Sequence, residues 1–284
     1  MPLKVIGVVL LAALCHATWN FLVKRSTDPY QGISAVVIGH VPFGLVGLYF
    51  APPLPATAWY YIVSGTILHL GYQFFLANSY KFGDLSQVYP MARGGAPLIT
   101  ALVSILFLNE PLKTVEIGAL VIIGAGIVSL AFTGDRQQMR RRYLPAFLAL
   151  VTAGFIASYS LVDGLGARHA GTAFGYYGWL TAINGLVFTL LVSRIRPGLV
   201  PLMLTRNLRQ TLFAGGISYL AYVLVIWSFT QAPIALVASL RETSVVFALL
   251  LGVVVLKERL TPLKAGAVLL TLAGIVLLRL GSFF

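Results

Sequence analysis

Two arginines stand inside long apolar stretches of this sequence. Arg93 lies in "VYPMARGGAPLITALVSILFL" and Arg241 in "VASLRETSVVFALLLGVVVL". An arginine inside a membrane costs at least about 3 kcal/mol on insertion scales, so it almost always faces protein or water and has a partner. Because guanidinium groups bind carboxylates and phosphates, the pair indicates a site for an anionic group. The alternative is structural, with each arginine bonding backbone carbonyls or glutamine side chains and holding helices together.

Two titratable residues near these arginines are candidates for proton coupling. Glu242 follows Arg241 directly, but adjacent helical residues point about 100° apart, so Glu242 could instead meet Arg93 or His16. A buried glutamate can exchange protons or form a static ion pair. His16 titrates near neutral pH and could relay protons or only pack. Asp163 falls near the end of an apolar stretch, and we expect it to be interfacial.

Polar and aromatic residues at helical spacing indicate the walls of a cavity. In "CHATWN" His16 and Asn20 are four residues apart, beside Trp19, and "LHLGYQFFLANSY" and "ISYLAYVLVIWSF" carry further polar and aromatic residues. Helix packing is the alternative explanation for such aromatic stripes. The candidate substrate-binding residues are Arg93, Arg241, Glu242, Tyr89, His16, Trp19, Asn20, His69, Tyr72, Gln73, Tyr219 and Tyr222.

The composition predicts an integral membrane protein. Of 284 residues 58% are apolar and 10% are charged, against about 25% charged residues in soluble domains. The net charge of +12 does not indicate nucleic-acid binding, because most cations lie in short connectors between apolar runs. The single cysteine, Cys15, excludes an internal disulfide and a cysteine-based metal site. We expect neither a metal nor a cofactor.

Ten apolar segments of about 20 residues, each long enough to cross about 30 Å of hydrocarbon, divide the chain. Within the fourth, Gly94, Gly95 and Pro97 predict a broken or thinned helix beside Arg93, a break that the ninth does not repeat. The predicted segments lie near residues 3–23, 31–50, 57–79, 85–108, 115–133, 144–163, 172–193, 211–230, 233–256 and 263–280.

A shift of 148 residues aligns the chain with itself. Residues 110–130 and 258–278 are then identical at nine of 21 positions, and Arg93 falls on Arg241. The chain therefore reads as two halves, 1–137 and 138–284, and five spans in each force the second half to cross in the opposite sense. Such inverted repeats build the midplane site of secondary transporters. In opposite orientations the two arginines would differ in depth by only about 6 Å.

The sequence resembles the ten-helix EamA-type members of the drug/metabolite transporter superfamily. The resemblance is carried by "WNFLVK" (19–24), "LNEPL" (108–112), "LKERL" (256–260) and the Gly/Ala-rich fifth and tenth segments, and it covers essentially the whole chain. It implies a transporter whose fifth and tenth spans lie at the periphery, where small residues would let them pack together or form an oligomer contact. Small multidrug relatives carry a glutamate in the first span, and this sequence has none there.

These observations predict a secondary transporter, an exporter or exchanger, of a small anionic or zwitterionic metabolite by alternating access. The alternative within the superfamily is a translocator of a lipid or lipid-linked sugar. Motifs of intramembrane enzymes and nucleotide-binding loops are absent from the sequence, so we expect no enzymatic activity. Expected partners are the substrate and membrane lipids, not nucleic acid, with the protein a monomer or homodimer.

Orientation follows from the connectors. With both termini on one side of the plasma (inner) membrane, the opposite connectors hold 14 lysines and arginines against four on the terminal side. By the positive-inside rule this places the termini outside the cytoplasm. The resemblance implies the opposite orientation, with cytoplasmic termini.

Overall fold

The protein is built from α-helices. A computed structural model describes residues 1–24, 28–82, 85–108, 112–130, 143–256 and 261–280, and all regular secondary structure in these ranges is helical. A helix satisfies its backbone groups internally, which apolar surroundings require. The helices are α1 (Leu3–Lys24), α2 (Pro29–Tyr49), α3 (Ala58–Phe82), α4 (Leu85–Phe107), α5 (Thr114–Leu130), α6 (Tyr143–Ala170), α7 (Ala173–Ile195), α8 (Leu199–Leu204), α9 (Leu208–Phe229), α10 (Ile234–Arg241), α11 (Ser244–Leu256) and α12 (Pro262–Leu280).

The predicted apolar segments coincide with helices, although α6 continues to Ala170, past the predicted end of the sixth segment. Two further differences concern the ninth segment and the connector before α9. The ninth segment is divided between α10 and α11, and the short α8 lies in the connector before α9. In the described residues five helices are long and apolar enough to cross a membrane, within α1, α2, α6, α7 and α9, and shorter apolar helices occur in α4, α5 and α12. The protein is an integral, multi-pass membrane protein by these criteria.

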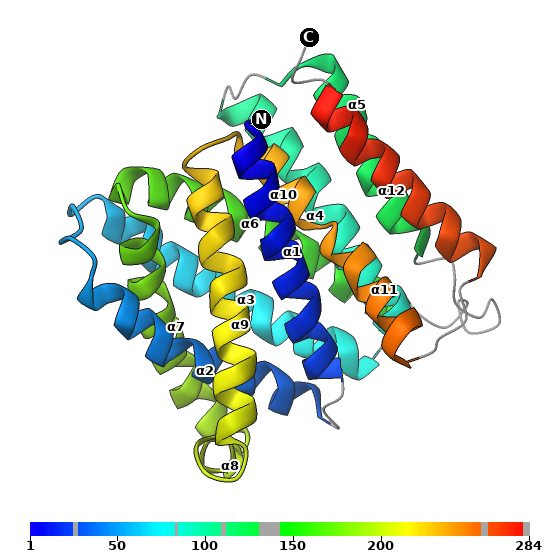
Figure 1. The fold of residues 1–284 in the computed structure, drawn as a ribbon. Helices are drawn as coiled ribbons and strands as arrows, with labels where there is room; N and C mark the ends of the chain where they lie inside the picture. The colour runs from blue at the N-terminus through cyan, green and yellow to red at the C-terminus, as the bar shows by residue number, and fades with distance from the viewer. Residues whose placement is uncertain (25–27, 83–84, 109–111, 131–142, 257–260, 281–284) are drawn as a thin grey trace.

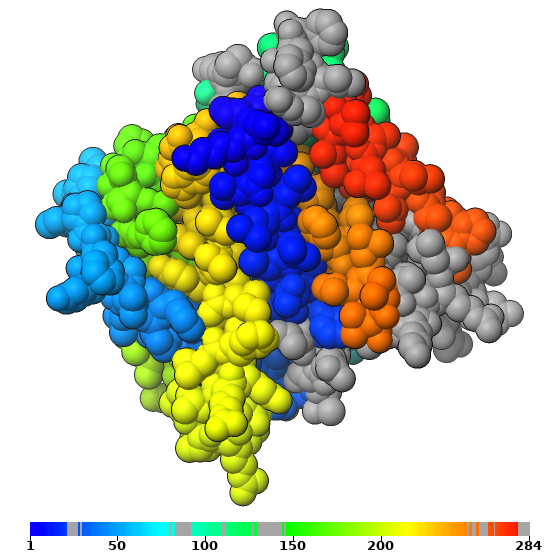
Figure 2. All heavy atoms as spheres, viewed as in Figure 1, coloured from blue at the N-terminus to red at the C-terminus, as the bar shows by residue number. Residues whose placement is uncertain are grey.

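Helices from distant parts of the chain pack around the centre of the bundle. The helix α1 lies between α9 and α11 on the face shown in Figures 1 and 2, and it also contacts α10. Behind it, α6 packs against α3 and α4. The helix α2 packs against α7 and α9. This arrangement brings α1, α3, α4, α6, α9 and α10 to the centre, where the polar side chains collect. The first turn of α1 and the last turn of α12 lie at the same end of the bundle (Figure 1).

The helices α5 and α12 lie side by side at one edge of the bundle (Figure 1). A methyl group added at Gly126 would meet Thr271 and the carbonyl of Ala267, and one added at Gly274 would meet Ile123. Glycine at these positions lets the two backbones approach closely. The expectation that the fifth and tenth segments pack together agrees with this contact. Most of the motif "LKERL" and part of "LNEPL" lie outside the described residues.

The predicted break in the fourth segment is wrong. The helix α4 continues from Leu85 to Phe107 through Gly94, Gly95 and Pro97. The break lies instead in the ninth segment, where α10 ends at Arg241 and α11 begins at Ser244. Between them, Glu242 and Thr243 donate their backbone N–H groups three residues back, to Ser239 and Leu240. This tighter turn ends one helix and begins the next, and it places Arg241 and Glu242 at the end of α10.

Candidate functional site

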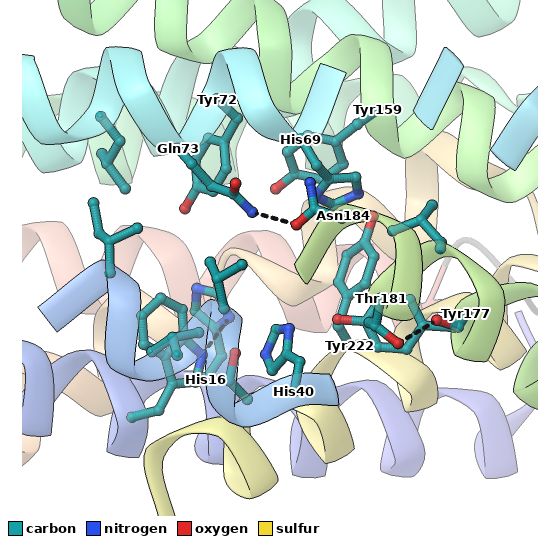
Figure 3. A pocket seen from close by; sticks show the side chains of 17 residues that line it. His16, His40, His69, Tyr72, Gln73, Tyr159, Tyr177, Thr181, Asn184 and Tyr222 are labelled. Atoms are coloured by element: carbon teal, nitrogen blue, oxygen red, sulfur yellow. Dashed lines mark hydrogen bonds between the residues drawn. The ribbon is translucent and has the colours of Figure 1, made fainter. Parts of the chain in front are cut away.

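A central cavity of about 80 Å³, large enough for a few water molecules, lies between the helices (Figure 3). Its walls come from α1, α2, α3, α6, α7 and α9. They combine aromatic rings with hydroxyl, amide and imidazole groups, and Ile33, Val36, Val37, Leu76 and Leu180 add apolar surface. The polar and aromatic residues in the walls are His16, Trp19, His40, His69, Tyr72, Gln73, Tyr159, Tyr177, Thr181, Asn184, Ser218 and Tyr222.

Part of the polar wall has hydrogen-bonding capacity to spare. Gln73 donates from Nε2 to Oδ1 of Asn184 at 2.8 Å (Figure 3). Oε1 of the same glutamine and Nε2 of His40 are buried, and neither has a hydrogen-bond partner among the described residues. A buried polar group without a partner costs free energy, so these atoms favour a polar occupant of the cavity.

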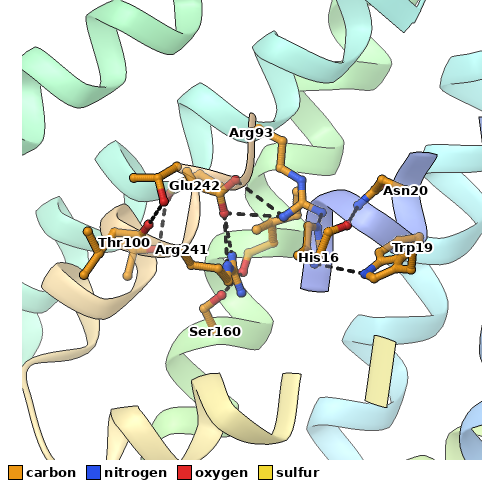
Figure 4. A network of polar contacts seen from close by, with 12 residues as sticks. His16, Trp19, Asn20, Arg93, Thr100, Ser160, Arg241 and Glu242 are labelled. Carbon is orange, nitrogen blue, oxygen red and sulfur yellow. Dashed lines mark hydrogen bonds and ion pairs between the residues drawn. The ribbon is translucent and has the colours of Figure 1, made fainter. Parts of the chain in front are cut away.

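A cluster of three charged residues lies beside the cavity (Figure 4). Arg93 from α4 and Arg241 from α10 both direct their guanidinium groups at the carboxylate of Glu242. The Nη1 of Arg93 lies 3.4 Å from Oε1, and Arg241 donates to the same oxygen from Nη2 at 2.9 Å and from Nε at 3.1 Å. The arginines are 2% exposed and Glu242 is 0% exposed. Two buried cations therefore share one buried anion.

His16 links this cluster to the cavity wall. Its Nε2 contacts Nη2 of Arg93, and its Nδ1 accepts a hydrogen bond from the indole N–H of Trp19 at 3.2 Å (Figure 4). Both ring nitrogens thus face groups that can only donate. Asn20 is bonded within α1 itself, because its Nδ2 donates to the backbone carbonyl of His16 at 2.8 Å.

Asp163 forms a second buried cluster, and the expectation that it is interfacial is wrong. Its carboxylate is 0% exposed, because α6 continues to Ala170, past the predicted end of its segment. Oδ2 lies 2.7 Å from Nε2 of His69 and accepts a hydrogen bond from the hydroxyl of Tyr222 at 2.7 Å. Oδ1 accepts a hydrogen bond from Tyr176 at 3.0 Å. Three polar groups from α3, α7 and α9 therefore converge on one carboxylate.

Aromatic rings connect the two clusters. The guanidinium carbon of Arg241 lies 5.9 Å from the ring centre of Tyr159 and 6.0 Å from that of Tyr222. Tyr159 in turn stacks on His69, with ring centres 4.3 Å apart. The faces of aromatic rings attract cations, so these contacts stabilise Arg241 in addition to its ion pair with Glu242. The carboxylate of Asp163 and the guanidinium of Arg241 thus share Tyr222 as a neighbour.

The predicted site residues are distributed over this region. His16, Trp19, His69, Tyr72, Gln73 and Tyr222 line the cavity, and Arg93, Arg241 and Glu242 lie next to it. Tyr219 lies behind the wall and stacks on Tyr177 at 5.1 Å. The side chain of Tyr89 lies outside the described part of the structure. Within the described residues no group of three or more His, Cys, Asp or Glu side chains could hold a metal ion.

Several residues of the wall were not found from the sequence. These residues, which lie in predominantly apolar helices, are His40, Tyr159, Tyr177, Thr181, Asn184 and Ser218. The available signal is a polar residue inside an apolar stretch, because such residues face protein or water. These residues come from four different helices, and which face of each helix turns toward the cavity is evident only from the packed structure.

Comparison with known proteins gives a family and a fold. The model of the EamA-like transporter family matches residues 144–280. A solved structure described only as the crystal structure of a protein is similar over 99% of this chain and 98% of its own, with a TM-score of 0.75 and 20% identity. At that identity the likeness concerns the fold alone. None of the curated proteins matches the chain.

Proposed function

Because the chain belongs, through residues 144–280, to the EamA-like transporter family of the drug/metabolite transporter superfamily, we propose that it is a secondary transporter of a small anionic or zwitterionic metabolite. The family indicates a membrane transporter. The substrate class is inferred from the side chains around the central cavity. Transport would be by export or exchange, driven by gradients across the plasma membrane.

The observation that carries the proposal is the unequal charge of the arginine cluster. Arg93 and Arg241 share the carboxylate of Glu242, so these three groups have a net charge of +1. A buried charge is costly unless it is compensated. The carboxylate of Asp163 balances this charge over the wider site, but it is bound by His69, Tyr176 and Tyr222. A carboxylate or phosphonate entering from the cavity would therefore be attracted to the local excess of positive charge at the arginines, and His16 lies between that cavity and Arg93.

The rest of the cavity suits the body of a small polar molecule. Oε1 of Gln73 and Nε2 of His40, which have no hydrogen-bond partner within the described ranges, supply polar contacts, and the rings of Tyr72 and Tyr159 supply apolar surface. A zwitterion could place its carboxylate toward the arginines and its ammonium toward the aromatic rings near Asp163. At about 80 Å³ the cavity would have to enlarge for most metabolites, as alternating access requires.

The proposed architecture is ten spans in two inverted halves, 1–137 and 138–284. The family match over 144–280 supports the second half as a unit, and the meeting of Arg93 with the Arg241–Glu242 pair supports a site between the halves. Both termini would then lie on one side, and the positive-inside rule favours the outside.

Uptake by the purified protein in liposomes tests the proposal. Labelled lactate, glutamate, alanine and methylphosphonate would be offered separately, with the same compound unlabelled inside. We expect at least one to exchange, and we expect Arg93→Gln and Arg241→Gln each to lower its exchange by at least about tenfold, since hydrogen bonds to charged groups contribute about 1.5–3 kcal/mol.

A matched control is Arg194→Gln. Arg194 is an exposed arginine in the last turn of α7, away from the cavity lining. This variant should exchange the same compounds at the wild-type rate. Wild-type exchange by folded Arg93→Gln and Arg241→Gln proteins would exclude the arginine cluster as the substrate site.

A further inference from the structure

The contacts of the titratable groups point to one site for a transported proton. Adding a proton to His16 would set its N–H groups against the donors of Trp19 and Arg93. Adding one to Glu242 would leave two buried guanidinium groups without an anion. His69, by contrast, has a carboxylate as its partner, because its Nε2 lies 2.7 Å from Oδ2 of Asp163.

The position of this pair suits a group that exchanges protons with the cavity. His69 lines the cavity, with 12% of its side chain exposed, whereas Asp163 is fully buried and accepts hydrogen bonds from Tyr176 and Tyr222. With Nε2 of His69 as a third donor beside the two tyrosine hydroxyls, the carboxylate is favoured as an anion. The imidazole is therefore the member of the pair that can gain or lose a proton.

Counting charges connects the proton to the substrate. With the histidines neutral, Arg93 and Arg241 are balanced by Glu242 and Asp163, so the ionisable groups of the empty site have no net charge. A bound monoanion makes the total −1, and a proton on His69 restores it to zero. Enclosing an uncompensated charge in a membrane protein is costly. The two states that can change access at low cost are the empty site and the site holding both ligands.

We propose that His69 and Asp163 form a proton-binding site and that one proton crosses the membrane with each monoanionic substrate. This inference rests on the proposed transport function and names its coupling ion. The proton binds His69 from one side of the membrane and leaves it to the other, together with the anion held by Arg93 and Arg241. The cycle is electroneutral, and its direction follows the sum of the two gradients.

The surroundings of His69 contain several other ionisable groups. Tyr159 stacks on its ring at 4.3 Å, and Tyr222 lies edge-on at 5.6 Å. The rings of Tyr159 and Tyr222 separate it from Arg241. The titratable or charged residues from the packed helices are His40 of α2, Tyr72 on α3 itself, Asp163 and Tyr159 of α6, Tyr176 and Tyr177 of α7, Tyr222 of α9 and Arg241 of α10.

The test measures proton and anion movement separately in liposomes that contain the purified full-length protein and a pH-sensitive dye. Labelled lactate, aspartate and glutamate, each with one net negative charge at neutral pH, serve as probes. We expect uptake of a transported probe to acidify the lumen by one proton per anion, and to be unaffected by a potassium diffusion potential. Anion uptake without protons would overturn the inference and leave the proposed function intact.

Two variants test the charge count by anion exchange. In exchange, only the substrate-bound form of the protein has to change its access from one side to the other. In His69→Asn the loaded site has a charge of −1, so exchange should fall by at least about tenfold. Adding Asp163→Asn returns the loaded site to zero, so the double variant should recover exchange to within about threefold of wild type, without moving protons. If the pair had a purely structural role, the second substitution would lower the exchange rate further.

The matched control is His169→Asn, since His169 is an exposed histidine that stacks on Tyr61 outside the cavity lining. It should leave both fluxes unchanged. Exchange by His69→Asn at the wild-type rate, or a double variant as slow as the single one, would refute the proton site. Failure of the wild type to take up any of the three probes would overturn the inference, and the proposed function would fall as well only if alanine and methylphosphonate were not exchanged either.

Discussion

Arg93 and Arg241, which stand 148 residues apart in the chain, bind the same carboxylate. Glu242 holds both guanidinium groups in a place where the side chains are at most 3% exposed. The contact joins α4 to the break between α10 and α11. The cluster therefore fixes the positions of three helix segments as well as the charge beside the cavity.

Removal of the shared carboxylate should strongly destabilise the protein. Glu242→Gln leaves two buried cations without an anion, and breaking a buried pair in this way costs about 3–5 kcal/mol. We expect the thermal unfolding midpoint in detergent to fall markedly for Glu242→Gln, and to recover in part for the double variant Arg241→Gln/Glu242→Gln. An unchanged midpoint for the single variant would show that the carboxylate does not hold the arginines.

Two tyrosines of α9 provide a second test. The hydroxyl of Tyr222 donates to the carboxylate of Asp163 at 2.7 Å, whereas the buried hydroxyl of Tyr219 has no hydrogen-bond partner among the described residues. Tyr222→Phe should therefore lower the free energy of unfolding by about 1.5–3 kcal/mol, the contribution of a hydrogen bond to a charged group.

Tyr219→Phe is the matched control for that substitution. It removes a hydroxyl that makes no such bond, so its unfolding midpoint should equal or exceed that of wild type. The two variants can be compared by thermal unfolding of the purified proteins in one detergent. Equal losses would contradict the assignment of Tyr222 as the partner of Asp163.

The arginine pair could be predicted because the repeat relates its two positions. Residues 110–130 and 258–278 set the shift of 148, and the same shift aligns Arg93 with Arg241. Helical spacing of polar residues along α3 likewise places His69, Tyr72 and Gln73 on one helix face, which is the face toward the cavity. Both patterns, the repeat and the helical period, can be read from the sequence without knowing how the helices pack.

Asp163 and the helix break could not be predicted in the same way. A segment of about 20 residues ends near residue 163, but α6 extends for 28 residues, so the carboxylate lies inside the bundle. Gly94, Gly95 and Pro97 were interpreted as helix breakers, yet neighbouring helices allow α4 to continue through them. Both errors came from local rules, and the packing of neighbouring helices decided each outcome.

The crossing of α2 and α9 depends on glycine. A methyl group at Gly39 would overlap the backbone of Thr211, and one at Gly215 would overlap the backbone of Gly39. Gly39→Ala and Gly215→Ala should therefore destabilise the protein by about 1–3 kcal/mol through overpacking. Gly7→Ala is the control, because a methyl group there meets no atom within 4 Å, and higher helix propensity should leave its unfolding midpoint equal or higher. Wild-type midpoints for both crossing variants would contradict the close approach.

The last prediction separates the charge of Arg93 from its shape. Its Nη1 faces Glu242 while its Nη2 contacts His16, so one planar group serves two partners. Lysine keeps the charge but is a compact point donor that cannot reproduce this fork. In the liposome assay with lactate, glutamate and methylphosphonate, Arg93→Lys should lower exchange of a transported anion by about tenfold and Arg93→Gln by more, since a bidentate guanidinium adds geometry to charge. Exchange by Arg93→Lys at the wild-type rate would mean that a positive charge alone is sufficient at this position. Equal losses in Arg93→Lys and Arg93→Gln would mean that the site requires the planar geometry of the guanidinium group.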